Sequence, residues 1–308
     1  MASDAYGFEL AKGKDGRIVE KTEWWADGVR RRWGYEYDAA GRLARVTLDG
    51  MLAESYEYDA EGRRASETVA LARIHGKRSS YTPEGRLVSH GRAFFAHDPQ
   101  GFRALREEAG PGGPRTTAWT YAPDYRLLRV ALPDGRKVTY DHDAEGRRAA
   151  KYVDGRVVER YRWKDFLRLD AWHDGERWWR FEYADDARVP HAAHADGRTL
   201  RLLADHLGSL KAVADSRGNL IQTTEYDAFG RVLEAAGAGE VEGPRPPLGF
   251  AGGLYDVDTG LVRFGWRDYD PATGRFTAQD PMGDHGGDPD WYGYCLDDPV
   301  NAVDPLGL

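Results

Sequence analysis

The chain repeats a short pattern in which an aromatic residue precedes an Asp, and a Gly-Arg pair follows within a few residues. Clear copies are Tyr37-Asp38 with Gly41-Arg42, and Tyr58-Asp59 with Gly62-Arg63. More degenerate copies follow at Tyr81, His97, Tyr121, His142, Trp163, Tyr183 and Tyr226. Most of the equivalent positions are roughly 20 to 24 residues apart, which is the range of repeat architectures. The chain must therefore fold by stacking many similar units.

Each unit predicts a β-hairpin. Side chains alternate along a strand, so Tyr35 and Tyr37 place two rings on one face. Asp38 can accept hydrogen bonds from the amides of its turn, and Gly41 can adopt a positive φ. A unit of about 21 residues accommodates two strands of roughly 6 to 8 residues and two turns. About ten hairpins in series bury their faces against neighbours. We expect an all-β fold of hairpins wound into a continuous coiled sheet or a hollow shell or barrel; several small separate β-domains are the alternative.

The composition supports this fold and excludes some functions. The sequence of 308 residues contains 37 Gly, 17 Tyr, 10 Trp and 10 Phe, which favours many short strands joined by turns. A net charge of -8 argues against a nucleic-acid partner. Cys295 is the only cysteine, so no internal disulfide is possible.

Two further absences bear on localisation. The sequence contains no run of about 18 apolar residues, so it predicts no membrane span. The first residues, Met1 to Gly7, lack the apolar centre of a signal peptide. We expect a protein that is made in the cytoplasm and then exported or delivered without a visible signal peptide.

Two Gly- and Pro-rich segments interrupt the repeats. Residues 110–114 predict a surface loop, and residues 235–247 predict a connection between two parts of the chain. The predicted organisation is therefore a β scaffold over residues 1–234, the connection 235–247, and a terminal core over 248–308.

The terminal core is dense in Asp residues, several of which precede Pro. Peptide hydrolysis by two carboxylates needs one charged Asp that activates water and one protonated Asp. Asp268 and Asp280 are separated by a turn-rich stretch that could bring the two carboxylates face to face. Arg267 could orient them or stabilise a developing oxyanion. Asp before Pro is also common at turns, and from this reading Asp270 caps its own turn.

The repeats resemble the YD repeats of the RHS family, which includes Rhs polymorphic toxins, the C components of insecticidal Tc toxins, and teneurins. The closing part resembles the RHS-repeat-associated core. The resemblance is carried by Asp205–Ser209, Tyr226–Gly230 and the run from Gly249 to Leu308, with its Arg-Asp-Tyr-Asp-Pro, Gly-Arg-Phe, Asp-Pro and terminal Asp-Pro-Leu-Gly-Leu sequences.

This resemblance implies a β shell that encloses a C-terminal toxin, with the core curled inside as a plug that acts as an aspartyl autoprotease. It implies one cut in cis after Leu308, made by Asp268 and Asp280 with Arg267 beside them. The residues expected to shape the cleavage segment are Pro299, Asp304, Pro305, Gly307 and Leu308. No cofactor or metal is expected; the expected partners are a downstream toxin domain and a secretion-system spike or adaptor protein.

Two other functions stay open. A structural or adhesion module, like the YD shells of teneurins, would use the same scaffold without catalysis. A glycosidase would need two carboxylates about 5 to 10 Å apart in an open groove. The segment Asp256–Gly260 resembles the start of a calcium loop but lacks the distal Glu, so we expect a hairpin turn there. The sequence also leaves open whether these repeats form a complete small shell or part of a longer one.

Overall fold

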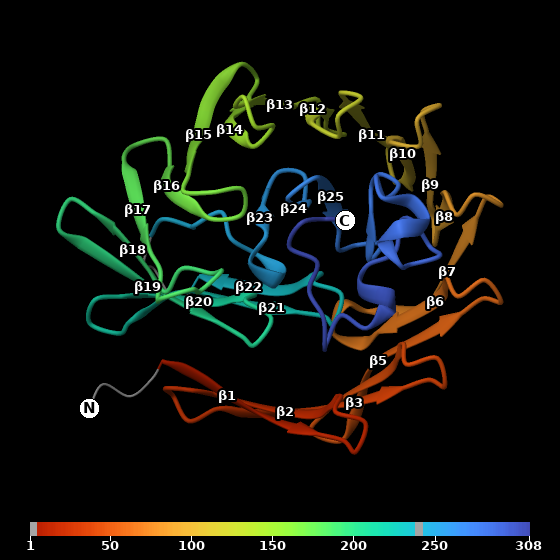
Figure 1. Ribbon diagram of the computed structural model, residues 1–308, viewed down its shortest axis with the longest axis horizontal. Coiled ribbons are helices and arrows are strands. Elements are labelled where there is room, and N and C mark those ends of the chain that lie inside the picture. Colours follow the sequence, from red (N-terminus) through yellow and green to blue (C-terminus); the bar gives the residue numbers. More distant parts are fainter. Residues whose placement is uncertain (1–4, 238–242) are drawn as a thin grey trace.

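Strands make up almost all the regular structure of the chain. The computed structural model describes residues 5–237 and 243–308 (Figure 1). The first eleven strands are β1 (Tyr6–Lys12), β2 (Ile18–Trp25), β3 (Arg30–Tyr37), β4 (Leu43–Leu48), β5 (Met51–Tyr58), β6 (Arg64–Val69), β7 (Ile74–Tyr81), β8 (Leu87–His90), β9 (Ala93–His97), β10 (Arg103–Gly110) and β11 (Gly113–Tyr121). A short 3-10 helix, η1 (Ala70–Ala72), separates β6 from β7.

The next eleven strands continue the series. They are β12 (Leu127–Ala131), β13 (Lys137–His142), β14 (Arg148–Val153), β15 (Arg156–Trp163), β16 (Leu169–His173), β17 (Trp178–Glu182), β18 (Ala192–Ala195), β19 (Arg198–Ala204), β20 (Leu210–Asp215), β21 (Leu220–Tyr226) and β22 (Val232–Gly237). The terminal segment holds β23 (Leu254–Tyr255), β24 (Val262–Phe264), β25 (Arg267–Asp270) and β26 (Arg275–Phe276), with 3-10 helices η2 (Phe250–Gly252), η3 (Gly283–Gly286) and η4 (Cys295–Asp297).

Strands β1 to β22 form one antiparallel sheet, and β23 to β26 form a second, smaller one. In the large sheet each strand pairs with the next along the chain, so the expected series of hairpins is confirmed. The sheet curves around the terminal segment, which lies inside the curve (Figure 1). Of the two forms expected, this is the continuous coiled sheet: within residues 5–237 and 243–308, no backbone pairing joins β22 to β1 to close a barrel.

The turn of each repeat is built as the sequence predicts. The Asp38 carboxylate accepts hydrogen bonds from the amides of Ala40 and Arg42 at 2.9 and 3.0 Å, and Gly41 has a φ of 86°. The Arg42 guanidinium donates to the second oxygen of Asp38 at 2.8 Å. The same capping recurs at Asp59, Asp143, Asp205, Asp215 and Asp227.

The repeat aromatic residue has a second role that the sequence did not indicate. The Tyr37 hydroxyl donates to the carbonyl oxygen of Ile18, at the start of a strand in the previous repeat, at 2.7 Å. Equivalent bonds run from Tyr58 to Leu43, Tyr81 to Arg64, Trp163 to Arg148, Tyr183 to Leu169 and Tyr226 to Leu210. Each repeat is thus fastened to the one before it by a side chain as well as by strand pairing.

The concave face of the sheet presents buried basic side chains to the terminal segment. They come from the position two residues after the repeat Gly, where Leu43 is buried in a regular repeat. Arg64, Arg103 and Arg148 occupy the same position and are equally buried. Their partners are, in order, the carbonyl oxygen of Thr273, the carboxylate of Asp270, and the carboxylates of Asp256 and Asp268.

The two ends of the large sheet contact each other through side chains. We call this contact the seam: β1–β5 on one side and β20–β22 with their turns on the other. Lys211 lies 3.6 Å from Glu23, and Arg31 lies 2.6 Å from Glu225. The Glu54 carboxylate accepts a hydrogen bond from the amide of Ala228 at 3.1 Å. Ion pairs and single hydrogen bonds therefore do what strand pairing does elsewhere in the sheet.

A short piece of the terminal segment bridges the seam. The Asn301 side chain accepts a hydrogen bond from the amide of Ile18 at 2.8 Å and donates to the hydroxyl of Tyr37 at 2.9 Å. The neighbouring carbonyl of Val300 accepts a hydrogen bond from His206, on the turn before β20, at 3.0 Å. Strands β2 and β3 and the turn before β20 are thus linked through residues 300–301.

The two interruptions in the repeats differ from expectation in detail. Strands β10 and β11 pair from Leu105↔Ala118 to Gly110↔Gly113, so the loop predicted at 110–114 is a tight hairpin with only two residues at its tip. Pairing between β10 and β11 satisfies the backbone hydrogen-bonding groups of residues 110, 113 and 114, which explains why the loop is shorter than predicted. Strand β22 includes residues 235–237 of the predicted connection, and residues 238–242 of it lie outside the described residues.

Two negative findings apply to residues 5–237 and 243–308. No helix there is long and apolar enough to cross a bilayer. No group of three or more His, Cys, Asp or Glu side chains there is arranged to hold a metal ion. The Asp256–Gly260 segment forms the expected turn, between β23 and β24, and its Asp256 carboxylate accepts bonds from Tyr140 and Lys151.

Replacing Arg103 with Met should lower the free energy of unfolding by about 3 to 5 kcal/mol, because Asp270 would keep a buried charge without its cation. Urea denaturation followed by Trp fluorescence measures this. The double variant Arg103→Met with Asp270→Asn should recover much of the loss. Arg180→Met, at a side chain that is 76% exposed, is the matched control. Equal losses in the single and double variants would contradict the pairing.

The seam should weaken as the pH rises. Burial, with the neighbouring Asp227 carboxylate, raises the pKa of Glu54 from 4.5 to about 8. Between these two values the folded chain holds a proton that the unfolded chain releases, so this group's contribution to stability falls as pH increases. Glu54→Gln should therefore reduce the loss of stability between pH 5 and pH 8, by on the order of 2 kcal/mol.

Unfolding free energies at both pH values test this expectation. Glu36→Gln, at an exposed position on β3, is the control and should leave the pH dependence unchanged. An unchanged pH dependence in Glu54→Gln would show that Glu54 ionises normally in the folded chain.

Candidate functional site

Strand β25 places the predicted site residues on opposite faces of the small sheet. All four of its residues are buried, and neighbours along a strand point in opposite directions. Arg267 contacts the end of the chain, whereas Asp268 contacts arginines of β14 and β24. Asp270 caps the turn to β26 by accepting a hydrogen bond from the amide of Ala272 at 3.0 Å, as expected.

Arg267 is the centre of one cluster. Its guanidinium donates to the carbonyl oxygen of Gly307 at 2.7 Å, to that of Trp291 at 2.9 Å, and to the carboxylate of Asp280 at 3.0 Å. The Asp304 carboxylate lies 3.6 Å away. Burial lowers the pKa of Arg267, and the carboxylates of Asp280 and Asp304 oppose that shift. One cation therefore connects two acidic side chains to the backbone near Leu308.

Asp280 is held in place by hydrogen bonds to both its carboxylate and its backbone amide. Its carboxylate accepts a hydrogen bond from the amide of Met282 at 2.7 Å, and its amide donates to the carbonyl of Trp291 at 2.7 Å. Gly286 packs against this carboxylate so closely that a Cβ there would lie 2.8 Å from an oxygen of Asp280. The absence of a side chain at Gly286 thus leaves room for the carboxylate.

The last residues form a turn that is locked against the start of β25. The Asp304 carboxylate accepts hydrogen bonds from the amides of Gly307 at 2.8 Å and Leu308 at 3.2 Å. The amide of Trp266 donates to the carbonyl of Leu306 at 2.8 Å. Gly307 has a φ of 65°, and a Cβ there would lie 2.5 Å from the carbonyl oxygen of Phe264, so only Gly fits. Burial raises the pKa of Asp304.

Asp268 belongs to a second cluster. Its carboxylate accepts a hydrogen bond from Arg263 at 3.0 Å, and Arg148 lies 3.4 Å away. In the described part of the chain, no hydrogen bond joins this carboxylate to Asp280. The structure thus brings together Arg267, Asp280, Asp304 and the Gly307–Leu308 backbone, and it pairs Asp268 with other arginines. The role of Asp268 with Asp280 as a catalytic pair stays a prediction.

The two proline residues of the predicted cleavage segment line two different spaces. Pro299 is buried and lines a space at the seam, and Pro305 lines a cavity beside β24.

Sequence reasoning missed Arg148 and Arg263 as partners of Asp268. A signal for Arg148 was present: it occupies an inward repeat position where other repeats have Leu. A cation at a core position needs a buried anion nearby. Arg263 carries no such signal, because its pairing depends on the register of β24 against β25, in which Arg263 lies opposite Asp268.

Comparison with known proteins identifies the family. The family model Teneurin YD-shell matches residues 4–286. The chain is 32% identical over 298 residues to probable deoxyribonuclease RhsB of Dickeya dadantii, covering 89% of this chain and 19% of that protein. It is 30% identical over 338 residues to double-stranded DNA deaminase toxin A of Burkholderia cenocepacia, covering 98% of this chain and 22% of that protein.

Solved structures support the same fold. The fold resembles that in the crystal structure of TcdB2-TccC3-TEV, with a TM-score of 0.55 and 17% sequence identity. The matched region covers 99% of this chain and 18% of the chain in that crystal structure. The chain thus spans about a fifth of the length of these relatives. Since the family model matches most of the sequence, this chain belongs to the Teneurin YD-shell family of Rhs-repeat proteins.

Proposed function

We propose that this chain is part of the carrier shell of an Rhs-type toxin, and that its terminal segment cuts the polypeptide after Leu308 to free a downstream toxin domain. The carrier role is supported by the different activities for which the relatives are named. A deoxyribonuclease and a DNA deaminase share this region. One region common to two different activities is better suited to carry a toxin than to perform either reaction. The curved sheet around the terminal segment suits enclosure (Figure 1).

The single observation that carries the cleavage proposal is the position of Arg267. It binds both the carbonyl oxygen of Gly307 and the carboxylate of Asp280. A turn capped by Asp304 holds the peptide beside them. A peptide bond held rigidly near a carboxylate and a buried cation is the arrangement that acid–base hydrolysis requires.

In the proposed reaction Asp280 takes a proton from a water molecule, and the water oxygen attacks the carbonyl carbon of Leu308. The bond from that carbon to the next nitrogen breaks, and a second carboxyl gives its proton to the leaving nitrogen. The products are a Leu308 carboxylate and a free amine on the downstream domain. The second carboxyl is Asp268 by resemblance to the family, and the reaction occurs once, in cis.

Asp304 is a second candidate for the proton donor. It shares Arg267 with Asp280, and burial raises its pKa, which keeps the proton to a higher pH than an exposed Asp would. An open groove of the glycosidase kind has less support, since Asp268 and Asp280 are both buried.

An extended protein carrying about 100 further residues tests the proposal by intact mass. The wild type should yield a fragment ending at Leu308, and Asp280→Asn should slow cleavage at least 100-fold, because removing a catalytic acid–base group costs that much or more. Asp268→Asn should do the same if Asp268 is the second carboxyl. Glu61→Gln, at an exposed repeat turn, is the control and should cleave normally.

The variants also separate the alternatives. Normal cleavage in Asp268→Asn with none in Asp304→Asn would identify Asp304 as the proton donor. An uncut wild type would instead support a structural or adhesion module without catalysis.

A further inference from the structure

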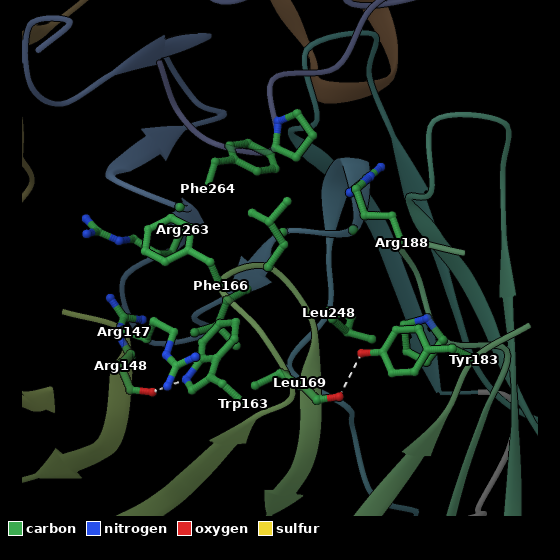
Figure 2. A pocket seen from close by; sticks show the side chains of 17 residues that line it. Arg147, Arg148, Trp163, Phe166, Leu169, Tyr183, Arg188, Leu248, Arg263 and Phe264 are labelled. Carbon is green, nitrogen blue, oxygen red and sulfur yellow. Dashed lines mark hydrogen bonds between the residues drawn. The ribbon is translucent and has the colours of Figure 1, made fainter. Parts of the chain in front are cut away.

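A cavity beside the terminal turn is lined by basic side chains, one of which, Arg188, has no ion-pair partner among the described residues. It is a half-open space between β14–β17 and the small sheet, with a cavity volume of about 40 Å³. Four arginines line it, and no carboxylate is among the lining residues. Figure 2 shows Arg188 and Tyr183 on one side and Arg147, Arg148 and Arg263 on the other.

Three of these arginines have carboxylate partners. Arg147 pairs with Asp143 and Glu145, and Arg148 and Arg263 share the carboxylate of Asp268, although Arg148 also lies 3.7 Å from Asp256. Arg188 makes its two hydrogen bonds to carbonyl oxygens, those of Ala251 at 2.6 Å and Leu207 at 2.7 Å, and forms no ion pair with a described carboxylate. Burial lowers the pKa of Arg188. A cation without an anion in a half-enclosed space favours an acidic ligand.

The rest of the lining is apolar and largely aromatic. Trp163, Phe166, Tyr183 and Phe264 contribute rings, and Leu169 and Leu248 contribute aliphatic surface (Figure 2). The side-chain nitrogen Nε of Arg148 is buried and has no hydrogen-bond partner. A ligand for this space therefore needs an aromatic or aliphatic group next to its negative charge.

A second space, of about 230 Å³, adjoins this cavity. Phe166, Arg263 and Gly265 line both. Asp124 and Glu145 line the second space, whereas Arg188, which has no ion-pair partner among the described residues, lines only the first. Two adjoining spaces suit an extended polypeptide better than a compact small molecule.

The terminal turn forms part of the wall. Pro305 lines the first space, and the carbonyl of Leu306 accepts a hydrogen bond from the amide of Trp266, next to Gly265. Pro305 and Leu308 are three residues apart, and an extended chain covers about 3.5 Å per residue. The first few residues after Leu308 can therefore reach the cavity.

We propose that this cavity binds an acidic side chain, together with a neighbouring aromatic or aliphatic one, in the polypeptide that follows Leu308. The proposal rests on the proposed function, because it takes the downstream segment as the occupant. It adds that the shell holds the start of its cargo at one defined place, through charge and ring packing.

The test uses the 308-residue chain and blocked, fluorescein-labelled octapeptides of alternating Glu and Phe, Gln and Phe, or Lys and Phe. Fluorescence anisotropy should show the Glu peptide binding at least tenfold more tightly than the other two, and weakening as salt increases. Equal affinity for all three peptides would overturn the proposal, as would equally tight binding of phenylpropionate, which would assign the cavity to a small molecule.

Two variants locate the binding. Phe166→Ser and Arg188→Gln should each weaken the Glu peptide at least fivefold. Trp178→Ser and Arg180→Gln change an aromatic and a basic residue on exposed parts of β17 and should leave affinity unchanged. Because Arg188 also bonds two carbonyls, Phe166→Ser keeps the test decisive if Arg188→Gln unfolds. Unchanged affinity in a folded Phe166→Ser would overturn the proposal.

Binding in this assay does not require cleavage. An extended chain that stays uncut would therefore count against the proposed function alone. Cleavage in an extended chain, with no peptide binding to the cavity, would count against this inference alone.

Discussion

Buried contacts between basic side chains of the large sheet and acidic side chains of the terminal segment hold the two parts of this structure together. Arg103 pairs with Asp270, Arg148 with Asp268, and Lys151 with Asp256. Removing such charges from water is costly, and the cost is offset only when both partners are present in good geometry. These ion pairs therefore fix where the terminal segment lies against the sheet, because a displaced segment would leave several buried charges unpaired. The alignment of β25, and with it the Arg267 cluster, follows from this constraint.

The repeat pattern was sufficient to predict the hairpins, because every feature that defines them is local. The Asp38 carboxylate bonds amides two and four residues later, and Gly41 supplies the positive φ. Strand order also followed, because each strand pairs with its neighbour in the chain. The hydroxyl bonds between repeats were missed because a Tyr on a sheet face reads as packing alone. Each hydroxyl bonds a carbonyl about one repeat earlier, and that relation can be recognised only once the alignment of the strands is known.

The site was predicted less completely, for a physical reason. The family resemblance implied roles for Arg267, Asp268, Asp280 and Asp304, since each stands in a short motif of that family. It could not indicate that Asp268 and Arg267 point to opposite faces of β25, because that requires knowing that this tetrapeptide is a strand rather than part of a turn. The seam was also beyond reach. Its partners, such as Lys211 with Glu23, are nearly two hundred residues apart, and no repeat rule relates them.

The bridge made by Asn301 has a consequence for the order of folding during synthesis. Hairpins with neighbouring partners can form one after another as the ribosome releases them. Asn301, however, bonds the backbone of Ile18 and the hydroxyl of Tyr37, both near the start of the chain. The first repeats must therefore wait for the 301st residue before these polar groups find their final partners. Residues made after every strand of the large sheet are therefore the ones that complete its earliest strands.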